Sequence, residues 1–164
     1  MAETANAHVN DSANSGANAS ANVAAHSSAA ATFRLIVATP ERYFFTGDAS
    51  SLTITTQDGE IGVLPGHMPM VVAIRNAPVR FLAGGEWREA ALSSGFAEIT
   101  GNRVVILADT AEWPEEIELN RALEAKRRAE ERLRAHRSDA EYMRSQVALQ
   151  RALTRINVSK LKKP

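Results

Sequence analysis

The stretch VVILADTAEWPEEIELNRAL, residues 104–123, contains the change in sequence pattern that decides the fold. Its first part, Val104–Ala108, is an apolar run of the kind that forms a buried strand. Trp113 and Pro114 end this pattern, since proline is well suited to the first position of a helix and the two glutamates that follow favour a helix N-terminus. We therefore expect strands before about residue 112 and helices after it.

The segment before this point has the pattern of an antiparallel β protein. Leu52 and Ile54 alternate with threonines, which predicts a strand with one apolar face. Gly84-Gly85 and Gly101-Asn102 are typical of hairpin turns, because such residues tolerate positive φ. Hairpins this close together, with no helix between them, favour a β-sandwich or flattened barrel. The expected strands are Phe33–Ala38, Ser51–Thr56, Met70–Arg75, Val79–Ala83, Trp87–Leu92, Ala97–Thr100 and Val104–Ala108.

The segment after Trp113 has helical periodicity. We expect a first helix from about Glu115 to His136, and the Ser138-x-x-Glu141 capping box predicts a second helix from about Asp139. The short break between them permits an antiparallel α-helical hairpin. Its alanines allow close approach of the helices but bury little area, so we expect the hairpin to be marginally stable. The expected apolar stripes are Leu119, Ala122, Leu123, Ala129 and Leu133 on the first helix, and Tyr142, Leu149, Ala152, Leu153 and Ile156 on the second.

Four parts are expected along the 164 residues. Residues 1–32 consist mainly of Ala, Asn and Ser, without Lys or Arg, which predicts a disordered low-complexity extension instead of a signal or transit peptide. Residues 33–112 form the β-sandwich domain, 113–158 the helical hairpin domain and 159–164 a basic tail. Apolar runs near 18 residues are missing, so no transmembrane segment is expected.

Composition and motif spacing argue against an enzyme. The sequence has no cysteine and only four histidines, at positions 8, 26, 67 and 136, whose spacing does not suit a metal site. It also lacks a phosphate-binding loop and a convergent set of acid, base and nucleophile. The formal net charge is zero, which argues against nucleic acid as a partner. We therefore expect a binding module with no catalytic residue, no metal and no required cofactor.

Two segments stand out from this background. The run 58–69, DGEIGVLPGHMP, is shaped by three glycines and two prolines; it is either a structural corner or a surface that exposes a carboxylate and an imidazole. Arginines and glutamates alternate over residues 121–137, which is typical of a solvated helix face. The alternative is an anion site, in which Arg121 and Arg128 of the first helix and Arg151 and Arg155 of the second converge on phosphates.

Through these segments the sequence resembles the epsilon subunit of bacterial and chloroplast F-type ATP synthases, from about Phe33 to Val158. The glycine–proline–histidine run is highly specific, and the other motifs follow it in the same order along the chain. The motifs are Gly47-Asp48, GEIGVLPGHMP at 59–69, SGFAE at 94–98, VILAD at 105–109 and IELNRA at 117–122, followed by Ala125 and Ala129.

The resemblance implies a ten-stranded sandwich in the rotor stalk of a proton-translocating synthase, peripheral to the membrane on the cytoplasmic face of the bacterial plasma membrane. The expected partners are the gamma subunit and the c-ring, contacted through Glu60, Pro65, His67 and Met68. The hairpin is expected to inhibit ATP hydrolysis when it extends toward the catalytic alpha and beta subunits, and to permit activity when folded down.

Some members of this family bind ATP to the folded hairpin through an Ile-Asp-x-x-Arg-Ala motif, which here reads Ile117-Glu118-Leu119-Asn120-Arg121-Ala122, with glutamate in place of aspartate. ATP is therefore the expected regulatory ligand. The residues assigned to it are Ile117, Glu118, Arg121, Ala122, Arg128, Arg151 and Arg155. Two alternatives remain at this point: a mitochondrial delta-type subunit, and a stand-alone ATP-sensing or adaptor module unrelated to the synthase.

Overall fold

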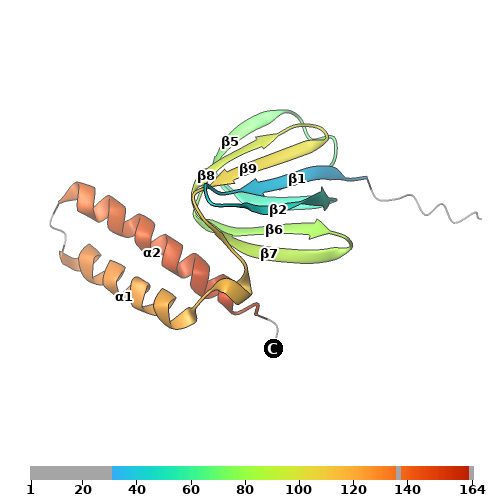
Figure 1. Ribbon diagram of the computed structural model, residues 1–164. Coiled ribbons are helices and arrows are strands. Elements are labelled where there is room, and N and C mark those ends of the chain that lie inside the picture. The colour runs from blue at the N-terminus through green and yellow to red at the C-terminus, as the bar shows by residue number, and fades with distance from the viewer. Residues whose placement is uncertain (1–30, 136–137, 163–164) are drawn as a thin grey trace, which may run out of the picture.

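A computed structural model describes residues 31–135 and 138–162 and consists of a ten-stranded β-sandwich followed by two helices (Figure 1). The predicted fold class is confirmed. The first sheet has the strand order β2-β1-β9-β8-β5, and the second has the order β10-β7-β6-β3-β4. The strands are β1 (Phe33–Ala38), β2 (Tyr43–Ala49), β3 (Ser51–Thr55), β4 (Glu60–Val63), β5 (Met70–Ile74), β6 (Ala77–Ala83), β7 (Glu86–Leu92), β8 (Gly95–Ile99), β9 (Arg103–Ala108) and β10 (Ala111–Glu112).

The core lies between the two sheets. Alternate residues of each strand point inward, so Leu35 of β1, Ile106 of β9, Leu52 of β3 and Phe81 of β6 are almost completely buried. The pairing of β1 with β9 is parallel, whereas the other named strand pairs are antiparallel.

All seven predicted strands are present, with ends that differ by no more than a few residues. The Gly84-Gly85 turn has the expected geometry, with φ of 60° and 81°. A turn also forms at Gly101-Asn102, but Gly101 does not adopt a positive φ. The strands β2, β4 and β10 were not predicted. The predicted extension lies outside the described residues, apart from Ala31 and Thr32.

The first helix begins later than predicted. Pro114–Glu116 form a 3-10 turn, η1, after which Ile117 is extended with φ −82° and ψ 120°; α1 then spans Leu119–Ala135. The prediction of a helix from Glu115 is wrong because Ile117 turns its side chain into a small buried cluster with Ala91 of β7 and Val158. The predicted helix end at His136 lies outside the described residues.

The second helix, α2, spans Asp139–Ser159. The Ser138 hydroxyl accepts a hydrogen bond from the Glu141 N–H at 3.3 Å, as the capping pattern predicted. Small side chains, spaced seven apart on each helix, are buried at the seam between the helices: Ala122 and Ala129 of α1, and Ser145 and Ala152 of α2. Leu119 and Leu123 were expected on the apolar stripe of the first helix but are exposed, since the buried positions of α1 are Ala122 and Ala129.

The hairpin leans against one end of the sandwich, where α2 contacts β6 and β7 (Figure 1). The contact is made by the last turns of α2 and includes the Ala91–Ile117–Val158 cluster. Within the described ranges, neither helix is long and apolar enough to cross a membrane.

Candidate functional site

Polar side chains hold α2 to the end of the sandwich. Asn76, in the loop between β5 and β6, is only 8% exposed, and its Oδ1 accepts hydrogen bonds from Ser94 N–H at 3.0 Å and from Arg151 Nε at 3.3 Å. Gln150 donates to the Asn76 carbonyl at 3.5 Å, and Arg151 also contacts the Asp109 carboxylate at 3.4 Å. We call Asn76, Asp109, Gln150 and Arg151 the clasp.

A second ion pair reinforces the clasp one helical turn further along α2. Arg155 Nε binds the carboxylate of Glu112, which follows directly after Ala111 in β10. Both side chains are about one-third exposed, so water screens this pair less than the other ion pairs of the described residues. The clasp and this pair are the polar part of the contact between α2 and the sandwich.

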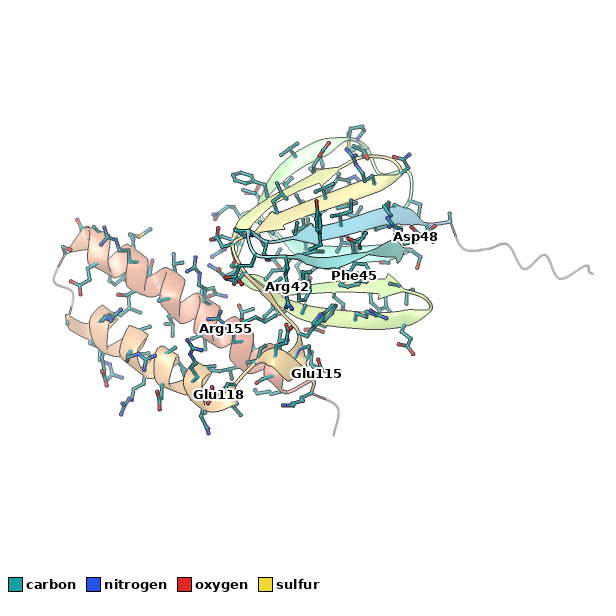
Figure 2. The ribbon with its side chains drawn as sticks, in the orientation of Figure 1. Arg42, Phe45, Asp48, Glu115, Glu118 and Arg155 are labelled. Carbon is teal, nitrogen blue, oxygen red and sulfur yellow. The ribbon has the colours of Figure 1, made fainter. Side chains whose placement is uncertain are left out.

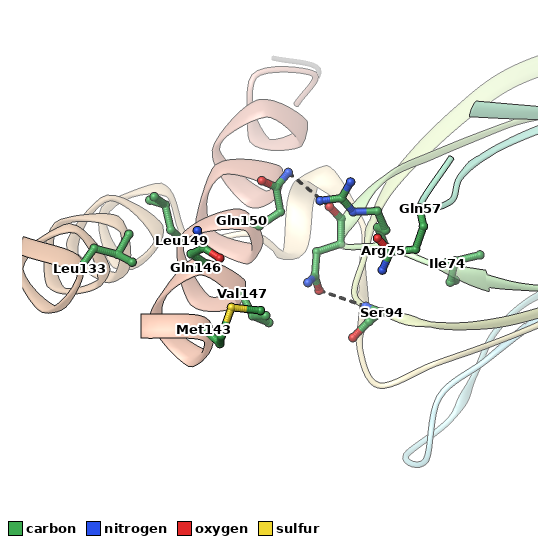
Figure 3. A pocket seen from close by; sticks show the side chains of 11 residues that line it. Gln57, Ile74, Arg75, Ser94, Leu133, Met143, Gln146, Val147, Leu149 and Gln150 are labelled. Atoms are coloured by element: carbon green, nitrogen blue, oxygen red, sulfur yellow. Dashed lines mark hydrogen bonds between the residues drawn. The ribbon is translucent and has the colours of Figure 1, made fainter. Parts of the chain in front are cut away.

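A crevice of about 560 Å³ lies beside the clasp, between the hairpin and the sandwich (Figure 3). Leu133, Met143 and Val147 line its hairpin side, and Ile74, Arg75 and Ser94 line its sandwich side. The crevice exists only while the hairpin is folded, because residues of both parts form its walls.

A polar cavity of about 400 Å³ lies at the base of the hairpin (Figure 2). Six of the seven residues predicted for ATP line it: Ile117, Glu118, Arg121, Ala122, Arg128 and Arg155. Arg151 is not among the lining residues, since its guanidinium is turned toward Asp109 and Asn76 in the clasp. The prediction that all four arginines converge at one place is therefore wrong for Arg151.

The charges of this cavity are balanced. Glu112, Glu116 and Glu118 face it together with Arg121, Arg128 and Arg155. Arg155 is held by Glu112, and Arg128 lies 3.4 Å from Glu124 on its own helix. Arg121 has no ion pair among the described residues, so it is the cation most available to an anionic ligand.

Glu116 fixes the segment that leads into the hairpin. Its carboxylate contacts Arg42 Nη2 at 2.7 and 2.8 Å and accepts the Trp113 N–H at 2.9 Å. Burial alone raises the pKa of the Glu116 carboxyl, but the Trp113 hydrogen bond and the Arg42 guanidinium together outweigh it and lower this pKa below its ordinary 4.5. The turn at Pro114 is thereby tied to the loop between β1 and β2.

The glycine–proline–histidine run lies along an open side of the sandwich. Glu60 is the first residue of β4, whereas His67 lies in the loop after it, so the two occur at opposite ends of this short edge strand. His67 Nδ1 lies 2.9 Å from the Met68 carbonyl oxygen, and the Met68 side chain is 71% exposed. Pro65 is half-buried. The run thus combines both readings of the sequence, a corner and an exposed surface.

The outer face of the first sheet carries an apolar surface that sequence reasoning missed. Val71 of β5, Phe96 of β8 and Leu107 of β9 are 69%, 60% and 57% exposed. Phe96 is paired with both Ala73 and Leu107, and Ile36 is paired with Val105. The sequence did contain a sign of this surface, because apolar residues occupy both the outward and the inward positions of these strands. We call Ile36, Val71, Ala73, Phe96, Val105 and Leu107 the apolar face.

Comparison with known proteins agrees with this architecture. The profile of the ATP synthase Delta/Epsilon chain beta-sandwich domain matches residues 32–114, and that of the Delta/Epsilon chain long alpha-helix domain matches residues 115–160. The ATP synthase epsilon chain of Ruminiclostridium cellulolyticum is 52% identical over 129 residues, which cover 79% of this chain and 96% of that protein. The epsilon chain of Caldicellulosiruptor saccharolyticus is 45% identical over 128 residues, covering 78% and 93%.

A solved structure shows the same fold. A chain of the Euglena gracilis mitochondrial ATP synthase (OSCP/F1/c-ring) superimposes with a TM-score of 0.69 at 23% identity, over 80% of this chain and 82% of that one. At this identity the likeness concerns the fold alone. The profiles, however, cover both the sandwich and the hairpin, and the bacterial relatives match over nearly their full length. The chain therefore belongs to the delta/epsilon chain family of ATP synthase.

Proposed function

We propose that this chain works as the non-catalytic epsilon subunit of the central stalk of a proton-translocating ATP synthase. In this role it couples the gamma subunit to the c-ring, and its mobile hairpin restrains ATP hydrolysis by the alpha and beta subunits. In this proposal the chain is peripheral to the membrane and lies on the cytoplasmic face of the bacterial plasma membrane. Family membership supports the subunit assignment and weighs against a module unrelated to the synthase.

The apolar face is the proposed contact with gamma. Three large apolar side chains that are each more than half exposed lie on adjacent strands, which is typical of a surface covered by a partner. The hairpin packs against the second sheet, so it leaves this face of the first sheet open.

The open side of the sandwich is the proposed contact with the c-ring. Glu60 and Met68 are exposed there, and Pro65 and His67 shape the loop between them. Gly66 has a φ of 80° and donates its N–H to the Gly101 carbonyl at 2.8 Å, which fixes the loop to a neighbouring turn. A rigid loop loses little conformational freedom on binding, which favours a lasting contact with polar loops.

The observation that carries the proposed brake is the way in which the hairpin is held. It is fixed by the clasp, the Arg155–Glu112 pair and a three-residue apolar cluster, and not by a continuous core. Polar contacts exchange readily with water, so their net contribution to stability is small. A folded and a released hairpin then differ little in free energy, which is the condition for a population switch.

The test is the ATPase activity of the parent catalytic complex, reconstituted with the full chain or with a chain ending after Glu118. The shorter chain keeps β10, η1 and the Arg42–Glu116 contact, so the sandwich remains intact. Release of ATPase activity by truncation supports the brake. If both chains bind and the ATPase activities are equal, the proposed inhibitory role of the hairpin is wrong, and the chain only couples gamma to the c-ring. Failure of both chains to bind gamma favours the unrelated module instead.

We further infer that the polar cavity is a regulatory ATP site, because six of the seven assigned residues line it. To bind the phosphates, Arg155 must release Glu112 and contact the ligand instead. Arg151 stays in the clasp. The test is an NMR titration with ATP of the wild-type chain, of Arg121→Ala and of a control, Arg127→Ala, whose side chain pairs with Glu131 instead. Chemical-shift changes in the hairpin that occur in the wild type and in Arg127→Ala, but not in Arg121→Ala, would support the site. If millimolar ATP causes no shift change in the hairpin of the wild type, the site is excluded.

A further inference from the structure

A groove of about 430 Å³ lies along β7 and the turn that precedes α1. Both tryptophans of the sequence line it, together with the turn that precedes α1 and one residue from beyond α2. Trp87 is half exposed there. The lining residues are Arg80, Glu86, Trp87, Arg88, Glu89, Trp113, Pro114, Glu115 and Leu161.

The groove follows a free strand edge. The short strand β10 pairs only with Ala91 and Leu92, at the end of β7. From Glu86 to Ala90 the same edge of β7 has no strand beside it in the part of the chain that the structure describes. Unpaired backbone groups of this kind accept an extended segment readily.

The groove has unpaired negative charge. Glu86, Glu89 and Glu115 have no ion pair among residues 31–135 and 138–162. Two arginines also line the groove, with Arg80 4.4 Å from the Trp87 ring and Arg88 5.8 Å from the Phe45 ring. Three glutamates against two arginines leave the groove with a net negative charge. The groove thus suits a short segment that carries an apolar side chain and positive charges.

The chain supplies such a segment where α2 ends. After Ser159 the sequence reads Lys160-Leu161-Lys162-Lys163, and Leu161 already lines the groove. Lys160 and Lys162 are exposed and have no ion pair with any described residue. The segment is attached directly to α2, so little entropy is lost when it reaches the groove.

We propose that residues 160–162 dock in this groove, with Leu161 as the apolar anchor and Lys160 and Lys162 against Glu86, Glu89 and Glu115. The inference rests on the proposed function in one respect, the mobility of the hairpin. Docking adds a contact between the end of α2 and the sandwich to those of the clasp, and this contact is lost when the hairpin leaves the sandwich. The segment therefore shifts the switch toward the folded state.

The two tryptophans report on this contact, because both line the groove. We would measure acrylamide quenching of the tryptophan fluorescence of the full chain and of Lys160→Glu/Lys162→Glu. The proposal predicts a roughly twofold larger quenching constant for the variant, since exposed ion pairs give small individual effects. High salt should raise the constant of the wild type toward that of the variant.

A control keeps the charge change and moves it elsewhere: Arg132→Glu/Arg144→Glu alters two exposed arginines of the hairpin and should leave the quenching unchanged. Glu86→Lys/Glu115→Lys, combined with the lysine reversal, should restore the protection. Equal quenching in the wild type and the lysine variant, or no restoration by the swap, overturns the proposal. Because the measurement uses the isolated chain, its failure is distinct from a failure of the ATPase brake.

Discussion

Asn76 connects three segments of the chain through one buried side chain, so its replacement should release the hairpin. Asn76→Ala removes the acceptor of the Ser94 N–H and of Arg151 Nε, whereas Arg151 Nη2 keeps its contact with Asp109. We expect α2 to lose about 1 kcal/mol of local stability, the usual net contribution of a hydrogen bond between partly exposed groups. Hydrogen exchange of the α2 amides would show this as faster exchange.

The matched control for Asn76 is Gln146→Ala, which changes an exposed side chain of the same crevice. Its α2 amides should exchange at the wild-type rate. Unchanged exchange in Asn76→Ala would show that the clasp does not hold the hairpin.

Glu116 should make stability depend on pH. Its folded pKa is lowered, so the carboxylate stabilises the folded state above the unfolded pKa near 4.5, and this contribution is lost as the pH falls through the folded pKa. Glu116→Gln should therefore cost about 1 kcal/mol at pH 7, as expected for a partly exposed ion pair with an added hydrogen bond. The difference from wild type should shrink below pH 4.5.

Urea unfolding at several pH values checks this expectation for Glu116. Glu41→Gln, at an exposed carboxylate with no ion pair among the described residues, is the control. A difference between Glu116→Gln and the wild type that stays constant down to pH 3 would contradict the assignment.

Single residues also show where sequence reasoning stopped. The spacing of Arg151 and Arg155 correctly put both on one face of α2, four residues apart. Whether these arginines bind phosphates or carboxylates depends on which loops of the sandwich lie opposite them. Sequence spacing alone does not reveal such tertiary contacts. Asp109 looks like an ordinary turn carboxylate in the sequence, yet it binds Arg151, and Glu112 binds Arg155.

At the scale of elements, the seam between α1 and α2 should not tolerate larger side chains. Ala122 of α1 and Ala152 of α2 are both buried, and the two helices pack against each other. Ala122→Leu should separate the helices and cost about 1–3 kcal/mol through overpacking. Thermal unfolding followed by far-UV circular dichroism should show the helical signal melting earlier.

Leu123→Ala tests the neighbouring position as a control, because Leu123 is exposed. It should leave the helical transition almost unchanged. A larger effect at Leu123 than at Ala122 would mean that the leucines, and not the alanines, form the seam.

Seven strands could be predicted because each has an apolar run bounded by turn residues. The strands β2 and β4 lacked that signal: Gly47 and Asp48 interrupt the first, and the second is only four residues of a glycine-rich run. They are strands because a neighbour pairs with them, β1 with β2 and β3 with β4. The helix start was misplaced for a similar reason, since the burial of Ile117 outweighs the helical pattern around it.

For the whole molecule, the apolar face should decide assembly. Phe96→Asp puts a charge at the centre of this face, where a partner would have to bury it, so we expect the affinity for gamma to fall roughly 100-fold. The fold should persist because the Phe96 side chain is 60% exposed. Surface plasmon resonance with immobilised gamma would measure the loss.

Thr53→Asp, on the outer face of the other sheet, provides the comparison. It should bind gamma with wild-type affinity. If both variants bind normally, gamma contacts another surface.

The parallel pair β1–β9 has a consequence for how the chain matures on the ribosome. β1 leaves the exit tunnel first, but its partner β9 begins only at Arg103, after every other strand of the first sheet has been made. Until then β1 has only β2 beside it, and the first sheet consists of two separated pieces. The first sheet is therefore completed by its last strand in sequence, through a long-range pairing that leaves one edge of β1 open until β9 arrives.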